Sequence, residues 1–210
     1  AGQFDVQFEA TPNTLESFWM PFTWNREFKR KPKVITGAKD MHYTSDDGQQ
    51  VLDGTAGLWC VNAGHGRQKI VEAVQQQVAR LDYAPAFQLS HPLAFQLANR
   101  LIGLAPGNGA FDHVFFANSG SEATMHAMRV ARSYTGNDII AKPEGGYAGA
   151  HDYALQSVYA SEEAMGPEDE PNTVSYGTGI PDAVSDTVVA FPFNDKEATE
   201  KILRKHADDM

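Results

Sequence analysis

The chain has 210 residues, of which 42% are hydrophobic and 21% charged, a composition typical of a globular protein with a core. Its formal net charge of -10 argues against a nucleic-acid partner or an anionic membrane surface. The single cysteine, Cys60, permits no internal disulfide, and no apolar run approaches the ~20 residues that cross a bilayer. Because the first residues also lack a secretory signal pattern, we expect a cytoplasmic α/β protein.

The N-terminal third predicts an arm, a hairpin and a glycine-spaced segment. The first forty residues mix aromatic side chains with a basic cluster at 29–33, which is typical of an arm that packs on another part of the protein. Segment 40–53 predicts a hairpin, because Gly48 can take the left-handed conformation between two short strands. In the next segment we expect the glycines to permit tight turns; they lie at positions 54, 57, 64 and 66.

Helical spacing then alternates with short apolar runs, which predicts a mostly parallel sheet covered on both faces by helices. Helix 121–134 is expected to have an apolar side that ends in Val130, Ala131 and Tyr134. Segment 162–171 is acidic and broken by Gly and Pro, so we expect a mobile surface loop. The expected helices are 70–81, 90–104, 121–134 and 195–206, and the expected strands 114–116, 139–141 and 187–191.

The stretch NSGSE at 118–122 lies where an apolar run meets a helical pattern. The first amides of a helix lack internal partners, and the helix dipole adds positive potential there. Gly120 lets the backbone approach a ligand closely, and Ser119 and Ser121 add hydroxyl donors, so the stretch predicts a phosphate-binding turn. Ser119 with Glu122 is also a capping box, which needs no ligand. Both interpretations hold together if one hydroxyl caps and the free amides bind.

This turn, the segment LDGTAGLWCVNAGHGR at 52–67 and the turn GGYAG at 145–149 resemble the class III aminotransferases. These are fold-type-I enzymes that use pyridoxal phosphate. Residues 15–104 look most like the ω-amino acid:pyruvate aminotransferases, and residues from about 138 onward look closer to the glutamate-1-semialdehyde aminomutase branch. The resemblance implies that residues 1–62 form an arm and hairpin segment of the small domain, and residues 63–210 the first part of the large cofactor-binding domain.

The resemblance also implies a cofactor site. Ser119, Gly120 and Ser121 would hold the phosphate of pyridoxal 5'-phosphate, and Tyr147 would stack on its pyridine ring; an ordinary loop aromatic is the alternative for Tyr147. Ala148 departs from the histidine usual at its position, which puts that histidine's orienting role in doubt.

His151 and Asp152 lie close to that position in the sequence and are the candidates to replace part of the missing histidine's role. Solvated loop residues are the alternative interpretation of both. Four apolar side chains match positions that line the substrate pocket in the ω-aminotransferases, with packing in the core as the alternative. They are Phe22, Leu58, Trp59 and Phe87, the last reaching the pocket from the partner subunit.

The implied activity is transfer of an amino group from an ω-amino acid or amine to a 2-oxo acid such as pyruvate, in a homodimer or larger homo-oligomer with its site at the interface. In the family, the lysine that forms a Schiff base with the cofactor and the aspartate that pairs with the pyridine nitrogen lie farther downstream, so we expect neither here. Lys142 is expected to be solvated. The alternatives are an aminomutase and a non-catalytic fragment that needs a second chain.

No metal site is expected, because the seven histidines form no H-E-x-x-H pattern and Cys60 has no second cysteine to complete a zinc site.

Overall fold

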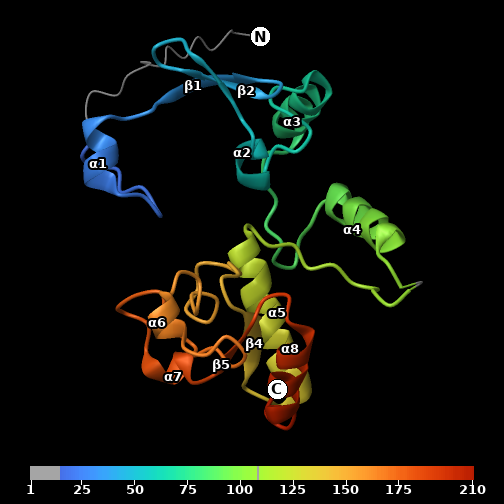
Figure 1. Cartoon of the computed structure of the whole chain (residues 1–210). Helices are drawn as coiled ribbons and strands as arrows, with labels where there is room; N and C mark the ends of the chain where they lie inside the picture. Colours follow the sequence, from blue (N-terminus) through green and yellow to red (C-terminus); the bar gives the residue numbers. More distant parts are fainter. Residues whose placement is uncertain (1–14, 108) are drawn as a thin grey trace. The chain divides into compact units, whose positions relative to one another are not determined.

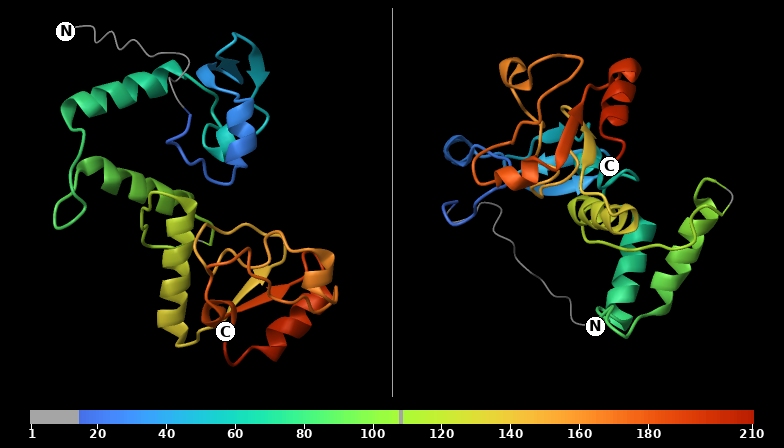
Figure 2. Two further views of the ribbon diagram at one scale, coloured as in Figure 1. Left: turned by 90° about the vertical axis from the view of Figure 1, so that its left-hand side faces the viewer. Right: turned by 90° about the horizontal axis from the view of Figure 1, so that it is seen from below.

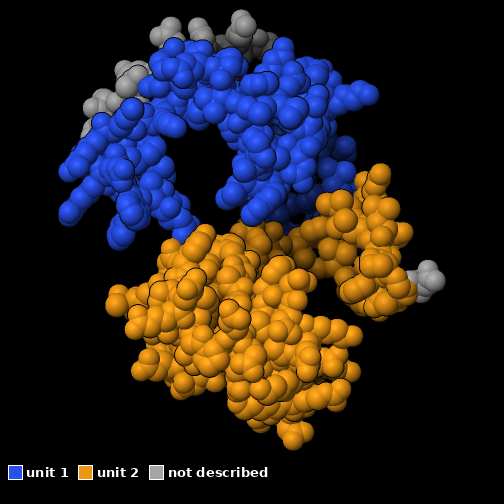
Figure 3. Space-filling view, in the orientation of Figure 1, with its two compact units in different colours: residues 1–95 blue, residues 96–210 orange. Residues whose placement is uncertain are grey.

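The computed structural model describes residues 15–107 and 109–210 (Figure 1). Contacts within the chain divide it into two compact units, unit 1 (Ala1–Phe95) and unit 2 (Gln96–Met210), which Figure 3 colours separately. The boundary expected at residue 62 separates the small and large domains of the family fold, which is a different division, and it stays a prediction.

Unit 1 contains a three-stranded antiparallel sheet in the order β1-β2-β3. The predicted hairpin is confirmed: His42 pairs with Leu52 and Tyr43 with Val51, and Gly48 has a φ of 81° in the connecting turn. The additional strand β1 has no alternating apolar pattern in its sequence ITGAK, and all five of its residues are exposed. The elements of this unit are α1 (Asn25–Arg30), β1 (Ile35–Lys39), β2 (His42–Ser45), β3 (Gln50–Leu52), α2 (Ala56–Trp59) and α3 (Gln68–Arg80).

Unit 2 is built around a parallel pair of strands, β4 and β5, in which Ile140 pairs with Val188. Helix α8 packs on β5, and both α5 and α8 lie beside the pair (Figure 2). The helix expected at 90–104 is α4, which begins two residues later, at Pro92, and the division between the units falls within it. The elements are α4 (Pro92–Leu104), α5 (Gly120–Thr135), β4 (Ile140–Pro143), α6 (Glu162–Met165), α7 (Asp182–Ser185), β5 (Val188–Phe191) and α8 (Lys196–Lys205).

The buried apolar side chains of the described residues all lie in unit 2. Val188 and Ala190 of β5 are buried, and so is Ile202 of α8, the helix that packs on β5; Ile202 is only 2% exposed. Burial of such side chains is the main favourable contribution to folding. The remaining members of this core are Ala154, Val158 and Ala198.

The expected mostly parallel sheet is found only in part, because the sheets are small and one of them is antiparallel. The strand expected at 114–116 is not formed. A strand requires a hydrogen-bonding partner beside it, and in the described part of the chain this segment has none. The expected apolar side of α5 is likewise exposed, at Val130 and Tyr134, since no described element covers it.

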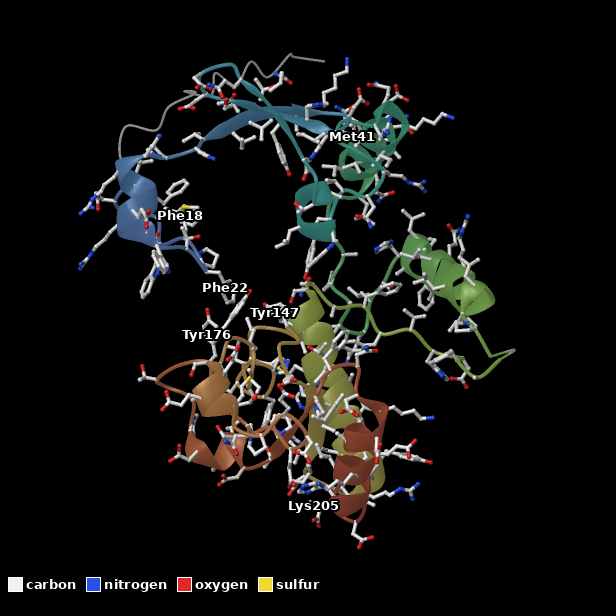
Figure 4. All side chains as sticks on the ribbon, viewed as in Figure 1. Phe18, Phe22, Met41, Tyr147, Tyr176 and Lys205 are labelled. Carbon is white, nitrogen blue, oxygen red and sulfur yellow. The ribbon has the colours of Figure 1, made fainter. Side chains whose placement is uncertain are left out.

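The acidic segment 162–171 lies at the surface except for the buried Pro171, and it contains the single turn of α6. Lys201 of α8 lies 3.4 Å from Asp169, and Lys205 of α8, labelled in Figure 4, pairs with Glu170. Exposed pairs of this kind stabilise a fold only weakly. The mobility of this segment stays a prediction.

Residues 15–107 and 109–210 contain no helix that is both long enough and apolar enough to cross a membrane. A cytoplasmic location stays a prediction from composition.

Replacement of Ile202 by alanine should destabilise unit 2, because it leaves a cavity between α8 and β5. We expect the free energy of unfolding in urea to fall by about 2–5 kcal/mol. Leu203→Ala is the matched control, since Leu203 is 37% exposed on the same helix and should cost much less. Equal losses in the two variants would contradict the position of this core.

Candidate functional site

Helix α5 begins with a capped turn. Ser119 has an extended backbone, with φ -151° and ψ 162°, and its Oγ accepts a hydrogen bond from the Glu122 N–H at 3.2 Å. The Glu122 carboxylate accepts from the Asn118 backbone N–H at 2.7 Å and from the Asn118 side-chain amide at 3.1 Å. The predicted cap is confirmed, but Glu122 reaches back to Asn118 instead of Ser119. Its carboxylate is therefore held by Asn118.

The backbone at Gly120 and Ser121 has the properties of an anion site. Within the described ranges, neither of these two amides donates a hydrogen bond to a protein group. Apart from the adjoining backbone, a methyl group at Gly120 would meet no protein atom within 4 Å, so the surface at this residue is open. The Ser121 Oγ accepts from the Ala150 N–H at 3.0 Å, which leaves its own proton available for donation. Two amides and a hydroxyl can thus bind one phosphate.

The loop that carries Tyr147 contacts the first turn of α5. Besides the bond from Ala150 to Ser121, the Thr124 hydroxyl donates to the Ala148 carbonyl at 2.7 Å. Gly149 allows this contact: its φ is 128°, and a Cβ there would lie 3.0 Å from the Ser121 Cα. Tyr147, labelled in Figure 4, is exposed on the same loop. The structure therefore brings the predicted phosphate turn and the predicted ring platform together.

His151 is held against α5, contrary to its interpretation as a solvated loop residue. Its Nε2 lies 3.1 Å from the Thr124 Oγ, the same hydroxyl that lies 2.7 Å from the Ala148 carbonyl oxygen. The His151 Nδ1 is buried and, in the described part of the chain, has no hydrogen-bond partner. Burial lowers the pKa of His151, although the Asp152 carboxylate partly opposes this shift. The sequence pattern of α5 does not indicate that Thr124 contacts both Ala148 and His151.

Lys142 is also buried, whereas solvation was expected. Only 3% of it is exposed at the end of β4, and its Nζ donates to the Pro143 carbonyl at 3.3 Å. Burial lowers the pKa of this amine, because the charged form loses its hydration.

The four candidate pocket residues lie in unit 1 and are exposed there. Leu58 and Trp59 belong to α2, which is a single left-handed turn: φ is 50° at Ala56, 60° at Gly57, 58° at Leu58 and 66° at Trp59. The turn is closed by bonds from the Trp59 N–H to the Thr55 carbonyl and from the Cys60 N–H to the Ala56 carbonyl, both 2.9 Å. Each residue other than glycine costs about 1–2 kcal/mol in this conformation.

The other two candidates lie outside this turn. Phe22, labelled in Figure 4, precedes α1 and has a φ of 48°, while Phe87 lies between α3 and α4. The role of all four in a pocket stays a prediction.

No group of three or more His, Cys, Asp or Glu side chains is placed to hold a metal ion in the residues that the structure describes.

Known proteins similar to this chain include aminotransferases and aminomutases. The family model "Aminotransferase class-III" matches residues 24–201. An omega-aminotransferase of Caulobacter vibrioides is 52% identical over 122 residues, which are 58% of this chain and 27% of that protein. A glutamate-1-semialdehyde 2,1-aminomutase of Methanococcus maripaludis is 32% identical over 185 residues, which are 88% of this chain and 40% of that protein.

Among solved structures, an omega-transaminase from Sphaerobacter thermophilus superposes with a TM-score of 0.77 at 34% identity. The superposition covers 85% of this chain and 39% of that one. The mixed α/β fold is therefore confirmed. The chain spans about a quarter of the length of the Caulobacter protein and two fifths of the Methanococcus protein.

Gly149→Ala should separate the loop from α5, because the added methyl group would collide with the Ser121 Cα. We expect the free energy of unfolding to fall by about 1–3 kcal/mol. The Ala150 amide should also exchange with deuterium faster, because its bond to Ser121 is weakened. Gly177→Ala is the control, since Gly177 has open space around it in the same unit. Unchanged exchange at Ala150 would disprove the role of Gly149.

His151 should make the stability of unit 2 depend on pH. Its pKa is lowered from 6.5 in the folded chain, so below about pH 6.5 the unfolded chain binds a proton that the folded chain resists. The free energy of unfolding is then highest above this pH and falls as pH decreases toward 5. His151→Gln should reduce this slope, and His113→Gln, at an exposed histidine of the same unit, should retain it. Identical slopes in both variants would contradict the burial of His151.

Proposed function

Because the chain belongs to the class-III aminotransferases, we propose that it provides the phosphate-binding and ring-stacking part of a pyridoxal phosphate-dependent transaminase site. The enzyme would move an amino group from an ω-amino acid or amine to a 2-oxo acid such as pyruvate. The 52% sequence identity with an omega-aminotransferase over 122 residues supports an ω-amino acid or amine as the donor. The family resemblance read from the motifs is thereby confirmed, while donor and acceptor are part of the proposal.

The observation that carries this proposal is the open first turn of α5. Its residues fit a phosphate monoester: the amides of Gly120 and Ser121 point away from the helix, and the Glu122 carboxylate is bound to Asn118. A doubly charged phosphate is favoured there by the unpaired amides and by the helix dipole. Ser119 contributes as the cap that holds the turn, and Ser121 contributes its hydroxyl proton.

The loop after β4 would place the ring. Tyr147 offers an exposed aromatic face on a loop that is bonded to the phosphate turn through Ala148 and Ala150. When bound, the cofactor would supply the electron sink that amino-group transfer needs. His151, held neutral by burial above its lowered pKa, would keep Thr124 bonded to the loop without adding charge near the ring.

The substrate side is proposed from unit 1. Phe22, Leu58, Trp59 and Phe87 would form apolar walls, which suit an amine that lacks an α-carboxylate. A homodimer or larger homo-oligomer, with Phe87 reaching the partner's site, is part of the same proposal. We assign the Schiff-base lysine and the carboxylate that pairs with the pyridine nitrogen to no residue of this chain.

An aminomutase is the second candidate, and one observation favours it. The match to the Methanococcus aminomutase covers 88% of this chain, whereas the match to the Caulobacter omega-aminotransferase covers 58%. An aminomutase shifts an amino group within one substrate and needs no external acceptor. Consumption of added pyruvate in proportion to the amine would therefore support the transaminase. Conversion of the amino substrate without pyruvate would support the aminomutase.

Gly120→Ala tests the phosphate turn without disturbing the fold. The added methyl group meets no protein atom, so the free energy of unfolding should stay the same or rise slightly. It would stand in the path of the phosphate, and we expect the Kd for pyridoxal 5'-phosphate, followed by absorbance titration, to increase about tenfold or more.

Gly103→Ala is the matched control, because Gly103 lies in α4 with equally open surroundings. It should leave the Kd unchanged. Equal cofactor affinity in both variants would rule out phosphate binding at this turn.

A further inference from the structure

The left-handed turn α2 is bonded to a buried carboxylate that the cofactor site does not use. The Asp53 Oδ2 accepts from the Gly57 N–H at 2.7 Å, in the middle of the turn, and the Asp53 Oδ1 accepts from the Thr55 N–H at 3.2 Å. The Asp53 side chain is only 3% exposed. One carboxylate therefore binds the backbone both before the turn and within it.

Two further side chains hold this carboxylate. The His65 Nε2 lies 2.8 Å from the Asp53 Oδ2, and the Tyr43 hydroxyl is hydrogen-bonded to the same group. The rings of Tyr43 and His65 are in contact, with centroids 4.6 Å apart. Burial favours protonation of Asp53, but the bonds from His65, Thr55, Tyr43 and Gly57 outweigh it and lower the pKa of Asp53. The carboxylate is thus ionised at neutral pH.

The turn would not keep its handedness unaided. Ala56, Leu58 and Trp59 all have positive φ, a conformation that residues with a Cβ leave unless surrounding bonds hold them. Leu58 and Trp59 have 66% and 76% of their surfaces exposed. Other large apolar side chains of unit 1 are exposed too. What sets Leu58 and Trp59 apart is a run of four residues with positive φ, and strain of this kind is typical of ligand sites.

We propose that Asp53 is a positioning residue for the amino donor: with His65 and Tyr43 it holds α2 left-handed, so that Leu58 and Trp59 present a preformed apolar surface to the hydrocarbon part of the amine. This inference rests on the proposed transaminase function and adds a specificity determinant to it. Asp53 itself does not touch the substrate. Its effect passes through the shape of the turn.

The direct test is the conformation of Trp59, which requires neither cofactor nor turnover. In the chain labelled with 5-fluorotryptophan, the Trp59 signal in the ¹⁹F spectrum is assigned by its loss in Trp59→Phe. We expect one narrow signal in the wild type and a broadened or second signal in Asp53→Asn and in His65→Gln. Asp47→Asn is the matched control, since Asp47 accepts similar bonds in the hairpin turn, from Ser45 and Gln49, and should leave the signal unchanged.

The second readout is selectivity among amines. In the active assembly that supplies the Schiff-base lysine, the ratio of kcat/KM for a long-chain and a short-chain primary amine should fall about tenfold in Asp53→Asn, mainly through a higher KM of the longer amine. Because Asp53 is proposed to act through the turn, Ala56→Gly in the Asp53→Asn background should restore the narrow ¹⁹F signal and most of the ratio. Glycine adopts the φ of 50° at this position without strain.

An unchanged ¹⁹F signal in Asp53→Asn, or a folded double variant without rescue, would overturn the positioning role. A wild-type chain that binds no pyridoxal 5'-phosphate at the first turn of α5 would instead overturn the proposed function. The ¹⁹F comparison would then still decide whether Asp53 holds the turn.

Discussion

The contact between the first turn of α5 and the loop after β4 is the constraint on which the proposed cofactor site depends. The Ser121 and Thr124 hydroxyls bind the loop backbone at Ala150 and Ala148, and Gly149 lets the two segments approach closely. These bonds hold the proposed phosphate-binding turn against the loop that carries Tyr147. In the proposed site, phosphate binding and ring stacking would therefore depend on one short interface and not on two independent loops.

Local features of unit 2 were predictable from sequence, because local residues determine them. The cap at Ser119 and Glu122 follows from hydrogen-bonding groups three residues apart, and α4 begins where Pro92 is tolerated. The contact of Thr124 with Ala148 and His151 was not predictable. It joins residues far apart in the chain, and a threonine inside a helix carries no sign of its partner.

The strands also show that contacts between distant residues cannot be predicted from local sequence. The pattern of 114–116 favours a strand, yet a strand exists only where a neighbour completes its hydrogen bonds. Lys142 is buried for a similar reason: its place at the end of a short strand says nothing about what covers it. In unit 1 the left-handed turn was only hinted at by Gly57, since Ala56, Leu58 and Trp59 have no preference for it.

The handedness of α2 has a consequence for how its surface can change. Right-handed and left-handed backbone conformations are separate energy wells with a steric barrier between them. In a right-handed turn the same residues would follow one another in the opposite rotational sense. The side chains of Leu58 and Trp59 would then point in different directions. No gradual bending connects the two arrangements. Loss of the hydrogen bonds to Asp53 would therefore remove the apolar surface formed by Leu58 and Trp59 in one step, without a partly distorted intermediate.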